Sequence, residues 1–485
     1  MAKGKLAYYA TMLYHTGSII LVNSVFLLIP GIYGYLIGEG DVAAYYVLFG
    51  IILLGIGYIV RTLLSATVPL TLGDAVVLTV FAWIIIPVIG GITLHLSTGM
   101  PLLDSLFEGV SGFTGTGLTM VTKPEAMPQT VLLWRSLMQW VGGLGVVVIS
   151  LALFARGVTV ARLALAEGRE ERIEPSIKRT IIAMLKIYVY ITIIATLALY
   201  LSGMNLFDAI NHAMTGVGTG GFSTHAKSVG FYGSLAVWYA AILSMVMGAI
   251  NFVDYSRLRR EGFKRFLGSV EVKTLLIIAF VGGSLTYVVL SHNLKVLDFR
   301  LYTESLFHAI SALTNTGFQV ASIIEYPDIV KMLFVTLMVI GGSTSSTSAG
   351  IKIYRLVVFL KAVGWEVKRI LLPPKAMLAP KIGTRIISDD VVRKVSVFIV
   401  LYIATLLIGS LITAYIYFYE GINVSYVDVL FETASAQTCT GLSVGLAGPH
   451  MPDAAKAVYI VIMLLGRLEI YPFIVVIAKA LGRGG

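Results

Sequence analysis

Long apolar segments constrain the fold of this chain more than any other feature. Runs of about 20 apolar residues recur along it, and a helix of that length crosses a hydrocarbon core about 30 Å thick. Hydrophobic residues make up 57% of the 485 residues and charged residues only 13%, a balance that a water-exposed surface does not have. A membrane β-barrel would instead show shorter segments of alternating hydrophobicity. The sequence therefore predicts an all-α integral membrane protein surrounded by lipid.

Ten apolar segments are long enough to be predicted as membrane crossings. They are residues 12–37, 43–65, 75–97, 131–154, 180–202, 234–253, 272–292, 329–358, 394–419 and 456–481. Within each of the last four pairs lies a shorter apolar segment, and these are residues 102–114, 205–216, 300–314 and 425–437. Because the four shorter segments cannot cross the core alone, we expect them to be re-entrant half-helices.

Basic residues gather in the connectors that follow the second, third and fourth pairs of crossings. Two connectors carry Arg156, Arg162, Arg169, Arg172, Lys178 and Arg179, and Arg257, Arg259, Arg260, Lys264 and Arg265; the third and richest runs from Lys352 to Lys394. The positive-inside rule then predicts a multi-pass protein of the cytoplasmic (inner) membrane, with these connectors and both termini in the cytoplasm. The first apolar segment lacks a small-residue cleavage site and is expected to be a retained anchor. The net charge of +10 does not indicate a nucleic-acid partner, because Lys and Arg are spread between apolar segments.

The same unit of crossing, half-helix, Gly-bearing loop and crossing recurs four times. The loops are Thr114–Leu118, Val217–Gly221, Thr314–Phe318 and Thr438–Leu442, and each contains Thr-Gly. The segments before them are also alike: Asp104–Glu108, Asn205–Asp208, Glu304–His308 and Asp428–Glu432. The repeat predicts a two-helix region at 1–68 followed by four tandem helix–pore loop–helix units at 69–157, 158–260, 261–365 and 366–485.

Four equivalent loops around a pseudo-four-fold axis have a definite chemistry. Irregular backbone at membrane depth is tolerated only where it is buried in protein or lines a watery cavity. Glycine at the repeated position permits positive φ, so carbonyl groups can point at the axis and replace the water around a cation. The carbonyl-rich C-terminal end of each half-helix also favours cations. The alternative is that the loops are packing turns in a transporter of another kind.

Three segments resemble the Trk/Ktr/HKT superfamily of potassium transporters, and its TrkH-type membrane subunits in particular. They are Phe107–Thr114 leading to Gly117, Gly221–His225, and Leu465–Glu469, and the resemblance covers almost the whole chain. The two extra N-terminal crossings are similar to the Trk branch. The resemblance implies one filter glycine per unit, at Gly117, Gly220, Gly317 and Gly441. Since Ser at the first of these commonly implies sodium transport in the family, Gly117 favours potassium.

The resemblance also implies a potassium-binding selectivity filter and a gate. The expected filter residues are Gly115, Thr116, Gly117, Leu118, Gly218, Thr219, Gly220, Gly221, Asn315, Thr316, Gly317, Phe318, Cys439, Thr440, Gly441 and Leu442. The thiol of Cys439 is interpreted as a small buried group without a role of its own. The gate is expected to consist of an intramembrane loop and a pore arginine, made of Gly341, Gly342, Ser343, Thr344, Ser345, Ser346, Thr347, Ser348, Ala349, Gly350 and Arg467.

The residues of this gate have their own physical reading. Glycine weakens helices and Ser and Thr compete for backbone hydrogen bonds, so residues 341–350 predict a break beside a polar cavity. The alternative is a Ser-rich helix packed closely on a neighbour. Arg467, midway in an apolar segment, is expected to face inward, either as a gate element or in an ion pair with Glu469 or another carboxylate. Arg135 is expected to snorkel or to brace a half-helix, and Glu108 and Glu432 to brace theirs.

No enzyme signature competes with transport. The histidines have no metal-ligand spacing, and neither a phosphate-binding Gly-rich loop nor a nucleophile elbow is present. The predicted function is potassium uptake through a channel-like pore, with potassium ion as the only cofactor and no organic cofactor. The alternative is a secondary active transporter that couples potassium to protons or sodium by symport. The resemblance implies a homodimer and a cytosolic, nucleotide-binding regulatory subunit of the TrkA type.

Overall fold

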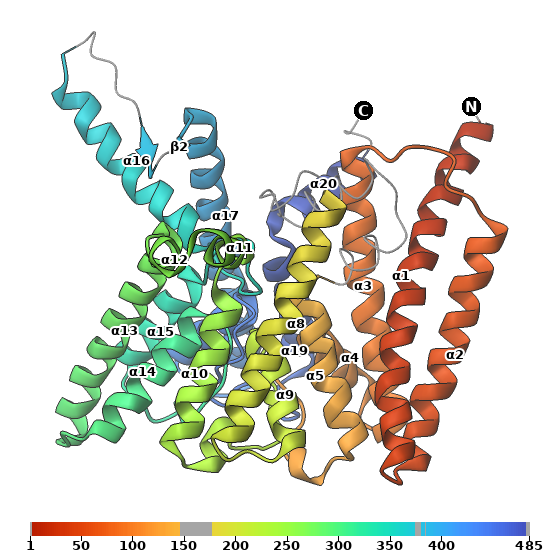
Figure 1. The fold of residues 1–485 in the computed structure, drawn as a ribbon, viewed down its shortest axis with the longest axis horizontal. Helices are drawn as coiled ribbons and strands as arrows, with labels where there is room; N and C mark the ends of the chain where they lie inside the picture. The colour runs from red at the N-terminus through yellow and green to blue at the C-terminus, as the bar shows by residue number, and fades with distance from the viewer. Residues whose placement is uncertain (1, 146–176, 374–379, 384, 482–485) are drawn as a thin grey trace.

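The chain folds almost entirely as helices. The computed structural model describes residues 2–145, 177–373, 380–383 and 385–481. Within them the only sheet is one antiparallel pair of two-residue strands, β1 (Lys381–Ile382) and β2 (Arg385–Ile386), beside the protruding helices α16 and α17 (Figure 1). The prediction of an all-α membrane protein is confirmed.

Six helices are long and apolar enough to cross a membrane alone. They are α1 (Ala2–Leu36), α2 (Gly40–Leu63), α3 (Leu72–Thr98), α8 (Ile177–Leu201), α13 (Val270–Leu294) and α17 (Asp389–Tyr419). Two bent pairs add two spans: α10 (Leu235–Ala249) with α11 (Phe252–Glu261), bent by 97°, and α19 (Asp453–Leu468) with α20 (Ile470–Ala480), bent by 104°. The described residues therefore hold up to eight spans by this measure, where the sequence predicted ten.

The two remaining predicted crossings are shorter than expected in the described residues. Residues 131–154 correspond to α5 (Gln129–Leu144), and the end of that predicted crossing lies outside the described residues. Residues 329–358 are divided into α15 (Asp328–Ile340) and α16 (Ile353–Leu371). The predicted break at 341–350 is thus confirmed, and the alternative prediction, a Ser-rich helix over these residues, is wrong. The basic residues of the 156–172 connector and the predicted boundary at 157 also lie outside the described residues, and the unit boundaries stay predictions.

Each predicted half-helix is a short helix within a residue or so of its expected bounds. The four are α4 (Leu102–Thr114), α9 (Leu206–Val217), α14 (Phe299–Leu313) and α18 (Tyr426–Gln437). Smaller helices follow some loops and connectors: η1 (Pro124–Ala126), η2 (Ser228–Tyr232) and α12 (Phe263–Leu267). The two ends of the chain lie on the same side of the molecule (Figure 1), as re-entry of the half-helices without crossing requires.

The four units close a ring. Each unit packs its half-helix between two longer helices, in the order α3–α4–α5, α8–α9–α10, α13–α14–α15 and α17–α18–α19. The last helix of each unit also packs on the half-helix of the next: α5 on α9, α10 on α14, α15 on α18, and α19 back on α4. Helices α1 and α2 lie outside this ring, against α3 and α5. The packing order therefore brings the four half-helices around one centre.

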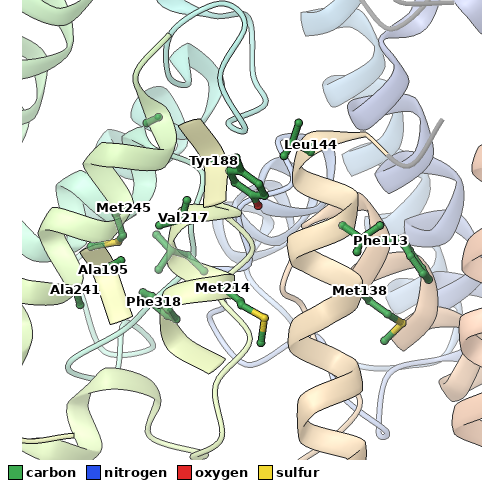
Figure 2. Close-up of a cluster of buried hydrophobic side chains, with 14 of the residues drawn as sticks. Phe113, Met138, Leu144, Tyr188, Ala195, Met214, Val217, Ala241, Met245 and Phe318 are labelled. Carbon is green, nitrogen blue, oxygen red and sulfur yellow. The ribbon is translucent and has the colours of Figure 1, made fainter. Parts of the chain in front are cut away.

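A buried apolar core joins neighbouring units. Figure 2 shows part of it, with side chains from α5, α8, α9 and α10 that include Met138, Leu144, Tyr188, Ala195, Met214, Val217, Ala241 and Met245. At two of the contacts between units, a lysine on the last helix of one unit also forms an ion pair with the half-helix of the next. The Nζ of Lys331 lies 2.7 Å from Asp428, and the Nζ of Lys456 lies 2.6 Å from Asp104, in the first turn of α4. The second pair closes the ring between the last unit and the first.

Removing this closing lysine is expected to destabilise the fold. Lys456→Met leaves the Asp104 carboxylate, 5% exposed, without its cation, and breaking a buried pair in this way costs about 3–5 kcal/mol. We expect a lower melting temperature for the purified protein in detergent, and recovery of most of the loss in Lys456→Met/Asp104→Leu. Lys394→Met, which removes the cation of an exposed pair with Asp390, is the control. Equal melting temperatures for Lys456→Met and this control would contradict the argument.

Candidate functional site

The loops that follow the half-helices share one backbone conformation. We number them loops 1 to 4 in chain order. Each has positive φ at two positions, two residues apart: Gly115 and Gly117, Thr219 and Gly221, Asn315 and Gly317, and Cys439 and Gly441. The residue between the two donates its N–H to a carbonyl of the half-helix: Thr116 to Ser111, Gly220 to Thr215, Thr316 to Ser311, and Thr440 to Ser435, at 2.8–3.0 Å. The four-fold repeat seen in the sequence is therefore a repeat of conformation.

This conformation corrects the predicted alignment of loop 2 by one residue. The sequence alignment paired Gly220 with Gly117, but the positive φ of 78° belongs to Gly221, and Gly220 occupies the place of Thr116. Gly218 then takes the place of Thr114, before the first positive-φ position. The same spacing holds in the half-helix, where Thr215 takes the place of Ser111, so Asp208 is the equivalent of Asp104. The letters alone favour Gly220, because Gly218-Thr219-Gly220 is identical to Gly115-Thr116-Gly117, and only the backbone angles assign the position to Gly221.

The second positive-φ glycine of each loop lies against the next loop. A Cβ atom built on Gly117 would overlap the carbonyl oxygen of Gly220, and one on Gly221 would overlap that of Thr316. In the same way Gly317 faces the oxygen of Thr440, and Gly441 faces that of Thr116, which returns to loop 1. We call Gly117, Gly221, Gly317 and Gly441 the glycine ring. Both the positive φ and the lack of room for a side chain require glycine at these four places.

The glycine ring opens into a vestibule. A cavity of about 310 Å³ is lined by all four of its members, together with side chains from the segments that follow the loops, among them Ser223, His225, Gln319, Ser443 and His450. Gly220 does not belong to this lining. The four loops therefore line one common cavity, which the interpretation of them as packing turns does not predict.

A side chain nine residues before each ring glycine ties the half-helix to the segment after the loop. Glu108 accepts the N–H of Met120 (2.8 Å), and Glu432 accepts that of Val444 (2.9 Å). In the other two units the position is histidine: His212 Nε2 lies 2.8 Å from Ser223 Oγ, and His308 Nε2 accepts the N–H of Val320 at 3.2 Å. These contacts are the bracing predicted for Glu108 and Glu432. No role was predicted for the two histidines. His308 was already aligned with Glu108 in the sequence, whereas His212 takes the equivalent position only in the corrected alignment.

Arg135 and Gln139, both on α5, serve loops 1 and 2. The Nε of Arg135 lies 2.8 Å from Glu108 and its side chain is 2% exposed, so it braces the half-helix and does not snorkel. Gln139 donates to the carbonyl of Gly220 (2.6 Å) and accepts the N–H of Phe222 (2.9 Å). Gln139 was missed in the sequence because a contact between neighbouring units leaves no local pattern.

The Ser-rich loop, residues 341–350, packs against loop 3 and the end of the second half-helix. Ser348 Oγ donates to Asn315 Oδ1 at 2.7 Å, and Asn315 Nδ2 donates in turn to Thr440 Oγ1 at 2.9 Å. Thr347 Oγ1 donates to the carbonyl of Val217, the last residue of α9, at 2.9 Å. All its residues except Thr344 are buried. The segment is therefore an ordered non-helical loop inside the protein, linked to the third and fourth loops and to the second half-helix.

Arg467 joins the Ser-rich loop to the end of α5. Its guanidinium donates to the carbonyls of Thr347 (3.0 Å), Gly142 (2.6 Å) and Gly143 (2.9 Å). The carboxylate of Glu469 is held by Arg355, at 2.7 and 3.0 Å. Arg467 also lines a second cavity together with residues of the Ser-rich loop. The expected inward position of Arg467 is thus found, with backbone carbonyls of two units as partners.

Comparison with known proteins gives one consistent answer. A family model described as TrkH, cation transport protein, matches residues 47–484. An uncharacterized cation transporter of Methanocaldococcus jannaschii is 33% identical over 472 residues, 96% of this chain and 95% of its own length. The Trk system potassium uptake protein TrkG of Escherichia coli K12 is 29% identical over 95% of this chain and 96% of its own. The crystal structure of the potassium transporter TrkH from Vibrio parahaemolyticus has the same fold, with a TM-score of 0.86, 24% identity, and coverage of 97% of this chain and 99% of that one.

Proposed function

Because this chain belongs to the TrkH family of cation transport proteins, a family of transporters and not of enzymes, we propose that it conducts potassium ions across the cell membrane through its four loops. The observation that carries the proposal is the glycine ring itself: each of its four glycines lies against the next loop, and all four line the vestibule. The names of two of its relatives, Trk system potassium uptake proteins of Halomonas elongata and Escherichia coli, favour potassium as the cation.

The proposed filter consists of the backbone of residues 115–118, 219–222, 315–318 and 439–442. Carbonyl oxygens replace the hydration shell of a cation where several of them converge. Four half-helices end at this point, and each contributes roughly half a negative charge from its carbonyl end. The threonine hydroxyls beside the ring bond one another, as Thr114 with Thr116 at 2.7 Å, and so stiffen the loops. The site therefore attracts cations and excludes anions by electrostatics alone.

The proposed gate is the Ser-rich loop together with Arg467. The loop occupies the space beneath the filter, and a guanidinium next to it repels a cation that leaves the filter, most strongly in a low-dielectric interior. Opening therefore requires the loop and Arg467 to move. The loops at the C-terminal ends of all four half-helices meet in the glycine ring, so the four units run in the same direction, whereas alternating access around a midplane site is typical of inverted repeats.

The proposed orientation places both termini in the cytoplasm. The basic helices α11 and α12 lie toward the same side as the termini (Figure 1), and the positive-inside rule assigns that side to the cytoplasm. The proposal includes a cytosolic, nucleotide-binding regulatory subunit of the TrkA type on this basic side, and a homodimer in the cytoplasmic membrane. The sequence resemblance supports both.

Tracer flux tests the function. Purified protein in proteoliposomes is expected to take up rubidium, with strong competition by potassium and weak competition by sodium. Gly117→Ser places a side chain at φ 83° against the carbonyl of Gly220, and discrimination against sodium is expected to fall by about tenfold or more. Uptake that sodium and potassium inhibit equally in the wild type would overturn the potassium pore.

A further inference from the structure

A buried carboxylate on the third unit contacts the Ser-rich loop. Glu271, in the first turn of α13, is 7% exposed. Its Oε1 accepts the backbone N–H of Thr344 at 2.7 Å, and both carboxylate oxygens lie 3.0 Å from the Thr344 hydroxyl. Thr344 is the only residue of the loop that is not fully buried. Glu271 therefore holds the loop at its most accessible position, away from the contacts with the filter.

The same carboxylate contacts the bend in the second unit. Asn251 lies between α10 and α11, where the chain turns by 97°, and its Nδ2 donates to Glu271 Oε2 at 2.9 Å. Its Oδ1 accepts the N–H of Val253 at 2.9 Å and so caps α11. Backbone bonds link the same bend to the loop, from Ser343 to Ala249 (2.9 Å) and from Phe252 to Ser345 (3.3 Å). One carboxylate thus joins α13, the bend of the preceding unit and the Ser-rich loop.

The chemistry of these contacts depends on charge. Hydrogen bonds to an ionised group are roughly twice as strong as those between neutral groups. A buried carboxylate is costly unless donors satisfy it, and the first turn of a helix favours its negative charge. Two of the donors to Glu271 belong to Thr344 and leave with the loop. The carboxylate is therefore better stabilised when the loop lies beneath the filter than when it moves away.

We propose that Glu271 is a positioning residue that latches the Ser-rich loop in the closed position, so that neutralising Glu271 releases the loop and raises cation flux. This inference rests on the proposed function, because it assigns to the loop the role of gate. It adds a second restraint, independent of Arg467, from a helix that contributes nothing to the filter. The latch also couples the bend between α10 and α11 to the gate.

The test compares rubidium uptake in proteoliposomes among single variants. Glu271→Gln keeps the size of the side chain but removes its charge, and flux is expected to rise by about tenfold. Thr344→Val removes one of the two donors and is expected to raise flux less. Because both act on one contact, Glu271→Gln/Thr344→Val is expected to raise flux no further than Glu271→Gln alone. A residue that merely stabilises the fold would show additive losses of flux instead.

Asp254→Asn is the matched control. Asp254 is 1% exposed and accepts hydrogen bonds from Ser269 Oγ (2.7 Å) and Arg257 (3.0 Å), both outside the Ser-rich loop. The cation flux of Asp254→Asn is expected to equal that of the wild type. An equal rise in Asp254→Asn and Glu271→Gln, or no rise in Glu271→Gln, would overturn the latch. If Glu271→Gln does not fold, Thr344→Val decides alone, and unchanged flux there overturns it. Absence of selective flux from the wild type as well would overturn the proposed function, whereas selective wild-type flux with silent variants overturns only the latch.

Discussion

Gly221→Ala is expected to abolish most discrimination between potassium and sodium, and Gly220→Ala to affect it much less. At Gly221 the backbone has φ 78° and a Cβ atom would overlap the carbonyl of Thr316. A non-glycine residue held in such a conformation costs about 1–3 kcal/mol, and overlap with a backbone atom that has no room to move adds to this cost. At Gly220 a Cβ atom would meet the end of the Gln139 side chain, which can shift.

The pair of variants separates the two possible alignments of loop 2. Rubidium uptake in proteoliposomes, with potassium or sodium as competitor, gives the selectivity of each variant, and the change in Gly221→Ala is expected to be on the order of tenfold or more. Gly317→Ala and Gly441→Ala change equivalent members of the glycine ring, and they are expected to lose as much selectivity for potassium over sodium as Gly221→Ala. A larger loss of selectivity in Gly220→Ala than in Gly221→Ala would restore the alignment made from the sequence.

Arg467→Gln is expected to raise basal flux by about tenfold without changing selectivity. Two unit charges 4 Å apart interact by about 4 kcal/mol at an effective dielectric constant of 20, so removing a cation beside the exit of the filter lowers a substantial barrier. Glutamine still offers an N–H to the carbonyls of Thr347 and Gly142. The measurement is rubidium uptake into proteoliposomes that contain the variant alone, without a regulatory subunit.

Arg467→Lys provides the matched control for charge. In the wild type the guanidinium of Arg467 donates to carbonyls of two units. Lysine keeps the positive charge but has a single nitrogen and cannot make the same set of hydrogen bonds. If charge closes the path, Arg467→Lys stays close to the wild type and Arg467→Gln conducts faster. If Arg467→Lys rises as much as Arg467→Gln, the hydrogen bonds rather than the charge hold the gate closed, and the electrostatic account is wrong.

Apolar length and composition were enough to predict the helices and their broad arrangement. The half-helices α4, α9, α14 and α18 were predicted almost to the residue, because each is an apolar segment too short to cross and is followed by glycine. The break at 341–350 was predictable because its ten residues are all glycine, alanine, serine or threonine. These features are local, and local composition determines them.

The remaining features depend on backbone angles and on contacts between units. Glu469 has φ 64° at the bend between α19 and α20, yet nothing in the apolar composition of 456–481 marks a break at this residue, so 456–481 was predicted as one continuous crossing. The bend at Asn251 was missed for the same reason. The alignment of Gly220 and Gly221 required the φ values themselves. Gln139 and Glu271 act on loops of other elements, and a single sequence carries no pattern for such contacts.

Locating a heavy substitute for potassium tests whether the four loops form one cation site. Crystals grown in rubidium or thallium salts would show the cation by anomalous scattering. We expect peaks on the axis enclosed by residues 115–118, 219–222, 315–318 and 439–442, with the glycine ring at one end. Peaks confined to positions away from these loops would contradict it.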